Sequence, residues 1–137
     1  MAIPQNTRFL VAEDDHLTRG ELVTNLRDLG FTGEVLEAEN GRDAYSLFIN
    51  QMIVGEKVGF IISDMVMPVF TGYDLLVQVR KDKAYQEIPF LMLTSKNDRE
   101  AVLKSAKAKV SNYLIKPWNL QMLGEKLHGC WKKHHPN

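Results

Sequence analysis

The chain alternates short apolar segments with amphipathic segments, and this alternation restricts the possible folds more than any other feature of the sequence. The apolar segments are typical of β-strands because they are short and bounded by polar or turn-forming residues. They cover residues 8–12, 34–38, 58–63, 89–93 and 111–115. Strands separated by helices run parallel, and right-handed crossovers place the helices on both faces of the sheet. The sequence therefore predicts an α/β fold: a flavodoxin-like, doubly wound parallel sheet of five strands in the order 2-1-3-4-5, with five helices.

The amphipathic segments carry apolar residues at helical spacing and polar residues at their ends. Gly30 suits the position after the first helix, where a left-handed backbone conformation is common. Asn40 and Asn119 are candidate N-caps of the second and fifth helices, and Asn97 or Asp98 is the candidate for the fourth. The residues of the fourth helix that are predicted to face inward are Val102, Leu103 and Ala106.

Length and charge are those of an ordinary globular protein. With 137 residues the chain is expected to form a single domain, residues 1–137, with a core of about 7–132. Its 17 Lys and Arg residues balance its 17 Asp and Glu residues, which argues against binding to nucleic acid or to a membrane surface. The single cysteine, Cys130, excludes an internal disulfide and fits a reducing compartment. Since there is neither a signal-peptide pattern nor an apolar run of transmembrane length, the expected location is cytoplasmic.

Two of the predicted strands end in carboxylates, where a turn residue is more usual. Asp64 follows the third strand, and Glu13 and Asp14 follow the first. These strands flank the switch point of the predicted sheet, and ligands bind at the carboxyl ends of strands there. Three carboxylates at one point repel one another unless a cation holds them, and an all-oxygen ligand set suits Mg²⁺. Asp15 is the next acid along and is a candidate for an outer position.

The fourth and fifth strands add a hydroxyl and an ammonium group to the same edge. Thr94 follows the fourth strand, and Lys116 follows the fifth, immediately before Pro117. Proline keeps the preceding residue extended, so Lys116 is expected to project from the strand end. This set suits phosphoryl transfer, in which Asp64 is the nucleophile and cations neutralise the transferring oxygens.

With these motifs the chain resembles the receiver domain of two-component response regulators, most closely the stand-alone chemotaxis regulators of the CheY type. The resemblance covers residues 7–132 and depends on motifs in order along the chain. These are Phe-Leu-Val-Ala-Glu13-Asp14, Ile-Ile-Ser-Asp64-Met-Val-Met-Pro68, Gly72-Tyr-Asp-Leu-Leu76, Leu-Met-Leu-Thr94-Ser95 and Tyr113-Leu-Ile-Lys116-Pro117.

The resemblance implies a role for each site residue. Asp64 would be the phosphoacceptor, while Glu13, Asp14 and the backbone carbonyl of Val66 would bind Mg²⁺ together with it. Thr94 and Lys116 would contact the phosphoryl group, Tyr113 would be the aromatic whose rotamer reports activation, and the Lys116–Pro117 peptide bond would be cis. The partners implied are a histidine kinase or phosphotransfer protein and a downstream protein target. No catalysis is expected beyond the chain's own phosphorylation and dephosphorylation.

The sequence departs from the family pattern at several positions. Val66 and Lys96 occupy positions at which relatives carry polar groups that tune hydrolysis of the phosphorylated form. The glycine that relatives have before the last strand is missing, and Lys109 and Asn112 lie in that stretch.

Three other functions are alternatives to this interpretation. A Mg²⁺-dependent phosphatase of the haloacid dehalogenase type needs a second acid two residues after the nucleophile, where this chain has Val66. A flavin-binding electron carrier needs a phosphate loop rich in Ser, Thr and Gly after the first strand, where this chain has acids. The third is a phosphate sink or phosphorelay intermediate that has no output of its own.

An output by protein–protein contact predicts one exposed surface formed by the fourth and fifth helices and the last strand. A hydrophobic centre with a polar, basic rim suits an acidic partner segment. The candidate members are Lys96, Arg99, Lys107, Lys109, Tyr113, Trp118 and Met122.

Overall fold

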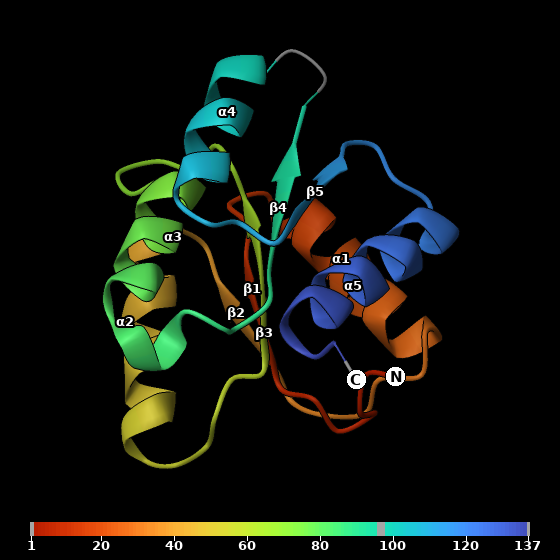
Figure 1. Cartoon of the computed structure of the whole chain (residues 1–137). Coiled ribbons are helices and arrows are strands. Elements are labelled where there is room, and N and C mark those ends of the chain that lie inside the picture. The colour runs from red at the N-terminus through yellow and green to blue at the C-terminus, as the bar shows by residue number, and fades with distance from the viewer. Residues whose placement is uncertain (1, 96–97, 137) are drawn as a thin grey trace.

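A computed structural model describes residues 2–95 and 98–136, and its order of elements is the predicted one (Figure 1). The strands are β1 (Phe9–Ala12), β2 (Val35–Ala38), β3 (Phe60–Asp64), β4 (Phe90–Thr94) and β5 (Asn112–Ile115). The helices are α1 (His16–Asp28), α2 (Gly41–Ile53), α3 (Gly72–Lys81), α4 (Arg99–Lys107) and α5 (Leu120–His134). A short 3₁₀ helix, η1 (Lys83–Tyr85), precedes β4 and was not predicted.

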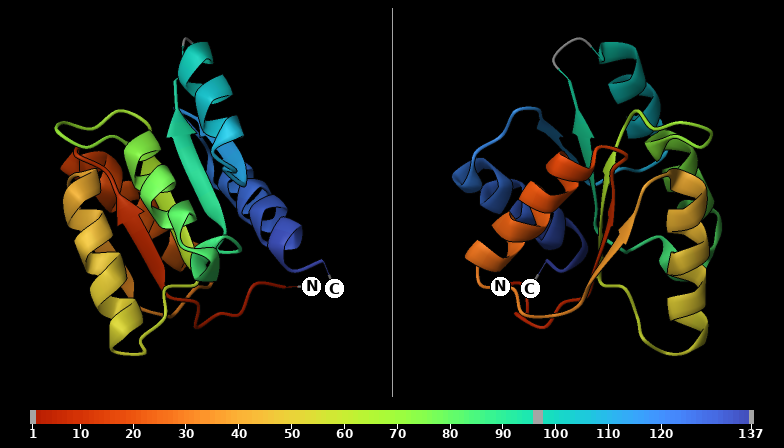
Figure 2. Two further views of the ribbon diagram at one scale, coloured as in Figure 1. Left: turned by 60° about the vertical axis from the view of Figure 1, so that its left-hand side comes forward. Right: turned by 180° about the vertical axis from the view of Figure 1, so that it is seen from behind.

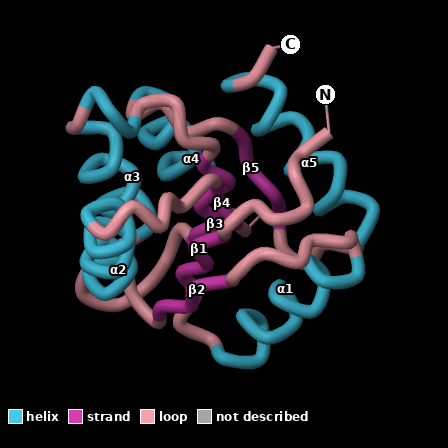
Figure 3. Tube along the Cα trace, turned by 90° about the horizontal axis from the view of Figure 1, so that it is seen from below, coloured by secondary structure: helices cyan, strands magenta, loops and turns pink. Residues whose placement is uncertain are grey.

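The strands form one parallel sheet in the order β2-β1-β3-β4-β5, which confirms the predicted topology (Figure 3). Helices α1 and α5 cover one face, and α2, α3 and α4 cover the other (Figure 1). Alternate strand residues supply the two hydrophobic clusters: Phe9 and Val11 pack with α1 and α5, whereas Leu10 and Ala12 pack with α2 and α3. The carboxyl ends of the strands therefore meet at one edge of the sheet, far from the two chain termini (Figures 1 and 2).

Local chemistry at the helix ends largely follows the prediction. The side chains of Asn40 and Asn119 cap α2 and α5 by accepting from the backbone N–H groups of Asp43 and Met122. Gly30 lies just beyond α1 with φ at 97°, a left-handed conformation. Asp98 occupies the N-cap position of α4 without a side-chain capping bond, and Asn97 lies outside the described residues.

The prediction for the inner face of α4 was wrong for two of three residues. Leu103 is 62% exposed and Ala106 is also exposed, whereas Ser105 is fully buried. The Ser105 hydroxyl donates within the helix, toward the carbonyls of Ala101 at 2.9 Å and Val102 at 3.1 Å. A serine that satisfies its hydroxyl in this way can be buried at little cost.

The turn between α4 and β5 is made without a glycine. Lys109 adopts φ of 68°, a left-handed conformation that favours glycine. Its carbonyl accepts from Arg80 Nε at 3.1 Å, and the guanidinium also donates to the carbonyls of Tyr85 and Ile88. The buried Arg80 side chain therefore holds this turn against the end of α3.

The end of α5 is tied to the sheet by a chain of three side chains. Ser111 Oγ accepts from the backbone N–H of Phe90 at 2.9 Å and lies 2.7 Å from His134 Nε2. His134 Nδ1 lies 3.1 Å from Glu87 Oε1. Burial lowers the pKa of His134, and the neighbouring Glu87 carboxylate only partly offsets this effect.

Because the folded-state pKa of His134 is depressed, its contribution to stability is present above its unfolded pKa of about 6.5 and is lost as the pH falls below it. We expect the melting temperature to fall more steeply between pH 7.5 and pH 5.5 for the wild type than for a His134→Gln variant. His128→Gln, an exposed change in the same helix, is the matched control and should keep the wild-type slope. Equal slopes for wild type and His134→Gln would contradict the prediction.

Cys130 is buried in α5, and burial raises the pKa of its thiol to about 12. Among the described residues, no helix is long and apolar enough to span a membrane.

Candidate functional site

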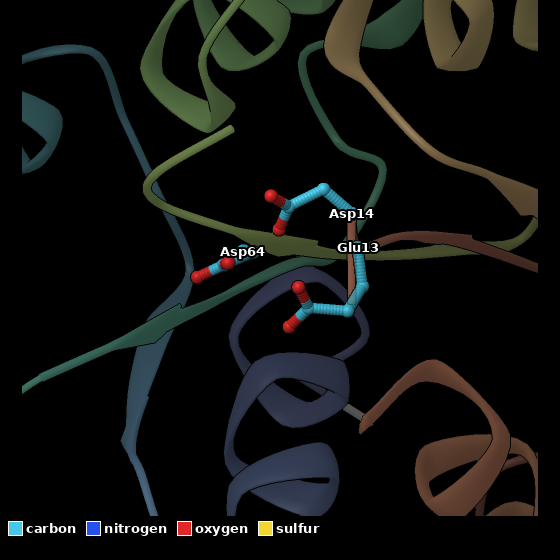
Figure 4. A group of neighbouring side chains, drawn as sticks. All are labelled: Glu13, Asp14 and Asp64. Carbon is cyan, nitrogen blue, oxygen red and sulfur yellow. The ribbon is translucent and has the colours of Figure 1, made fainter. Parts of the chain in front are cut away.

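The three predicted acids come together at the carboxyl edge of the sheet (Figure 4). β1 and β3 are neighbours with Ala12 opposite Ser63, so Glu13 and Asp64 emerge side by side. One carboxylate oxygen from each of Glu13, Asp14 and Asp64 lies within 4.8 Å of the others. Glu13 and Asp64 are buried and Asp14 is exposed, so the cluster opens to solvent on one side.

Lys116 lies across the buried pair of acids. Its Nζ is 2.7 Å from Glu13 Oε1 and 3.1 Å from Asp64 Oδ2. The peptide bond to Pro117 is cis, as predicted. Burial disfavours the charged amine, but the contacts with Glu13 and Asp64 outweigh this effect and raise the pKa of Lys116. The ammonium group therefore stays protonated at neutral pH.

One ammonium group does not offset the effect of burial on the Glu13 carboxyl group. Burial raises the pKa of Glu13 to about 7, although Lys116 and the backbone N–H of Asp15 both oppose this shift. The nearby Asp64 carboxylate raises it further. The donor set, three carboxylates at one point with a deficit of positive charge, fits a hard divalent cation such as Mg²⁺.

The β1–α1 turn is held in place by Arg19. Its Nη1 donates to the Glu13 carbonyl at 2.8 Å, and its Nε donates to Glu37 on β2 at 3.1 Å. Asp15, considered above as an outer acid, instead caps α1 by accepting from the Thr18 backbone N–H and hydroxyl. Hydrogen bonds from Thr18 lower the pKa of the exposed Asp15 side chain.

The β3–α3 loop brings backbone close to Asp64. A Cβ at Gly72 would lie 2.1 Å from the Asp64 carbonyl oxygen, so only glycine fits at the start of α3. Val66 is 66% exposed, which leaves its side chain outside the site. Val69 has a left-handed backbone with φ of 68°, and the Phe70 N–H on one side of it donates to the Pro68 carbonyl on the other side at 2.7 Å. Sequence reasoning missed the close approach of Gly72 and the left-handed backbone of Val69. For Gly72, the available signal was a glycine eight residues after a strand-end acid.

Thr94 and Tyr113 line the same small cavity. Thr94 ends β4 and is buried, and it lies opposite Ile115 in the register of β4 with β5. The cavity has a volume of about 300 Å³, and both Thr94 and Tyr113 line it. The Tyr113 hydroxyl donates to the Val102 carbonyl at 2.6 Å and lies 3.1 Å from Ser105 Oγ, so the ring is connected to α4.

The predicted output surface is divided. Trp118 packs against the cluster formed by α1 and α5, and its Nε1 donates to Asn25 Oδ1 at 2.8 Å. Lys107 and Lys109 instead border a groove with α3. The prediction of one surface containing all these side chains was therefore wrong, because the Trp118 indole finds its partner on α1. Lys96 lies outside the described residues.

Comparison with known proteins agrees with this geometry. The family model described as "Response regulator receiver domain" matches residues 9–128. A "Chemotaxis protein CheY homolog" of Campylobacter jejuni is 36% identical over 120 residues, which are 88% of each chain. "Chemotaxis protein CheY1" of Helicobacter pylori is 35% identical over 88% of this chain and 93% of its own. The solved structure of Vibrio cholerae chemotaxis protein CheY4 superposes with a TM-score of 0.75 at 30% identity, over 89% of this chain and 96% of that one.

Proposed function

The chain belongs to the response regulator receiver domain family, and we propose that Asp64 is its phosphoacceptor. As a member of that family, it is a phosphorylation-dependent signalling switch of a two-component system. The observation that carries the assignment of Asp64 is its position: it is the only acid of the cluster at the end of the central strand β3, in contact with Lys116 and beside Glu13.

In the proposed transfer, the donor is a phosphohistidine on a histidine kinase or phosphotransfer protein. An Asp64 carboxylate oxygen attacks phosphorus while the P–N bond to the donor imidazole breaks, and the imidazole leaves with the bonding electron pair. Mg²⁺ held by Glu13, Asp14, Asp64 and the Val66 carbonyl would neutralise charge on the transferring oxygens. Lys116 and the Thr94 hydroxyl are placed to stabilise the other phosphoryl oxygens. The chain catalyses no reaction besides its own phosphorylation and dephosphorylation.

The chemotaxis regulators among its relatives support a role in chemotaxis, with output through contact with a protein target. Phosphorylation would draw the Thr94 hydroxyl toward Asp64 and release space in the cavity that Tyr113 lines. Tyr113 would then exchange its bond with the Val102 carbonyl for a position inside that cavity. This is a two-state shift, so a minority of the unphosphorylated protein already adopts the second state.

Magnesium binding is expected to stabilise the fold, because the ion relieves repulsion among three carboxylates that the unfolded chain does not hold together. At a concentration tenfold above its Kd, the gain is about 1.4 kcal/mol. Asp14→Asn should remove most of this gain, while Asp28→Asn, an exposed change at the end of α1, should keep it. Thermal melts with and without millimolar Mg²⁺ measure the effect, and identical melts for the wild type would show that the cation site is misassigned.

Beryllofluoride, a phosphoryl mimic, tests the switch itself. In the presence of Mg²⁺ we expect amide shifts at Thr94, Val102 and Tyr113 in nuclear magnetic resonance spectra, because these residues share the cavity. Tyr113→Ala should still bind beryllofluoride but should show smaller shifts along α4. Shifts confined to the immediate neighbours of Asp64 would contradict a switch and leave a phosphate sink or relay intermediate.

A further inference from the structure

A groove between α3 and α4 carries positive charge only. Its volume is about 340 Å³, and its lining residues belong to α3, to the end of α4 and to the turn that follows α4. We call it the α3–α4 groove and define it by Tyr73, Val77, Arg80, Lys81, Lys107 and Lys109. The chain as a whole has no net charge, so this concentration of cations is local.

The lysines of the α3–α4 groove have no acidic partners among residues 2–95 and 98–136. None of Lys81, Lys107 and Lys109 forms an ion pair with a carboxylate in the described part of the chain. The Arg80 guanidinium binds three backbone carbonyls and keeps its charge inside the groove wall. The groove therefore offers uncompensated positive charge to a ligand.

Helix dipoles explain part of this pattern. Lys81 and Lys107 are the last residues of α3 and α4, where cations are favourable. Lys109 is different because it lies beyond α4, with φ of 68°, at a backbone position that favours glycine. Its backbone N–H and that of Val110 donate to the carbonyls of Ala106 and Ser105, so the Lys109 backbone closes the helix. Its side-chain ammonium group has no carboxylate partner in the described residues and stays available to a ligand.

The α3–α4 groove also contains the aromatic and apolar side chains of Tyr73 and Val77. Lys104 Nζ lies 4.4 Å from the centre of the Tyr73 ring, which adds a further cation beside the groove. Tyr73 and Lys104 also line a second cavity of about 400 Å³, but that cavity carries the carboxylates of Asp74 and Asp98. An acidic ligand is therefore expected to stay within the α3–α4 groove and to end near Tyr73.

The two uncharged side chains of the groove favour a peptide over an anionic small molecule. The carbonyls of Ser105 and Ala106 at the end of α4 already accept backbone N–H groups, so the helix end itself does not discriminate between these ligands. A phosphate group would contact the lysines but would bury no apolar surface against Tyr73 and Val77. A peptide can place an apolar side chain on Tyr73 and Val77 and carboxylates beside the lysines.

We propose that the α3–α4 groove binds an acidic segment of a partner protein, with an apolar side chain against Tyr73 and Val77 and carboxylates against Lys81, Lys107 and Lys109. The inference rests on the proposed function in that it assumes an output through protein contact. It adds a site that is separate from the cavity lined by Thr94 and Tyr113.

The test is a titration of the full chain with a short synthetic peptide of glutamates around a single phenylalanine, followed by amide shifts. We expect saturable shifts centred on Tyr73, Val77 and Ala108 and a loss of affinity at high salt. Lys81→Gln with Lys107→Gln should weaken binding about tenfold, and the matched pair Lys57→Gln with Lys132→Gln, also exposed, should not. Replacing the phenylalanine of the peptide by serine should weaken binding to the wild type.

Shifts centred on Ile115 and Met122, equal affinity for the two double variants, or absence of binding would each overturn the proposal. Binding of the serine peptide as tightly as the phenylalanine peptide would overturn the apolar contact and with it the proposed mode. Beryllofluoride shifts at Thr94 and Tyr113, measured on the same sample without peptide, report separately on the switch. A protein that does not bind the peptide in the α3–α4 groove can therefore be distinguished from one that lacks the proposed phosphorylation switch.

Discussion

With acetyl phosphate and Mg²⁺ as the only additions, the chain should acquire one phosphoryl group, and Asp64→Asn should acquire none. The amide of asparagine is not a competent nucleophile, and among the described residues only Asp64 ends the central strand β3 beside Glu13 and contacts Lys116. The product should be an acyl phosphate, which is labile to base. Intact-mass spectrometry before and after mild alkali measures both properties.

Two variants control this experiment. Asp15→Asn should still be labelled, because the Asp15 carboxylate caps α1 and does not face the cluster. Lys116→Ala should keep some labelling, since the nucleophile is intact, but labelling should no longer change the amides around Tyr113. A label on the Asp64→Asn protein that disappears in the Asp15→Asn protein would place the acceptor at Asp15.

Gly72→Ala should lower the free energy of unfolding by about 3 kcal/mol. A loss of this size is typical of overpacking where the neighbouring atoms cannot move away. The new Cβ would lie 2.1 Å from the Asp64 carbonyl oxygen and 2.9 Å from Met92 Sδ. The sulfur can move, but the carbonyl belongs to the central strand β3, so α3 or the end of β3 must shift. Urea denaturation measures the loss, and labelling by acetyl phosphate should slow because Asp64 moves with its backbone.

Gly20→Ala is the matched control for this change. Gly20 lies in α1, and nothing lies within 4 Å of a Cβ built there. Alanine should therefore raise stability by about 0.5–1 kcal/mol through helix propensity. If both variants unfold at the same urea concentration, the close approach of Gly72 to Asp64 does not constrain the loop.

The relation between sequence and structure differs from one part of this protein to another. The strand order and the meeting of Glu13, Asp14 and Asp64 followed from the sequence because a parallel sheet brings all the carboxyl ends to one edge. The caps at Asn40 and Asn119 were also predictable, since a capping side chain reaches only two or three residues along the chain.

Only the tertiary structure determined the contacts of Lys116 and Trp118 and the burial of Ser105. Each of these depends on which residues, distant in sequence, pack beside the side chain. Lys116 projects from its strand as Pro117 requires, but its contact with Glu13 joins residues 103 positions apart. The sequence did not indicate whether the Trp118 indole would face α4 or α1. In the structure it faces α1, where its Nε1 donates to the side chain of Asn25. Ser105 is buried, and Leu103 is not, because of how α4 is rotated on the sheet. Local patterns report apolar faces and allowed backbone conformations, whereas packing between elements determines what each side chain meets.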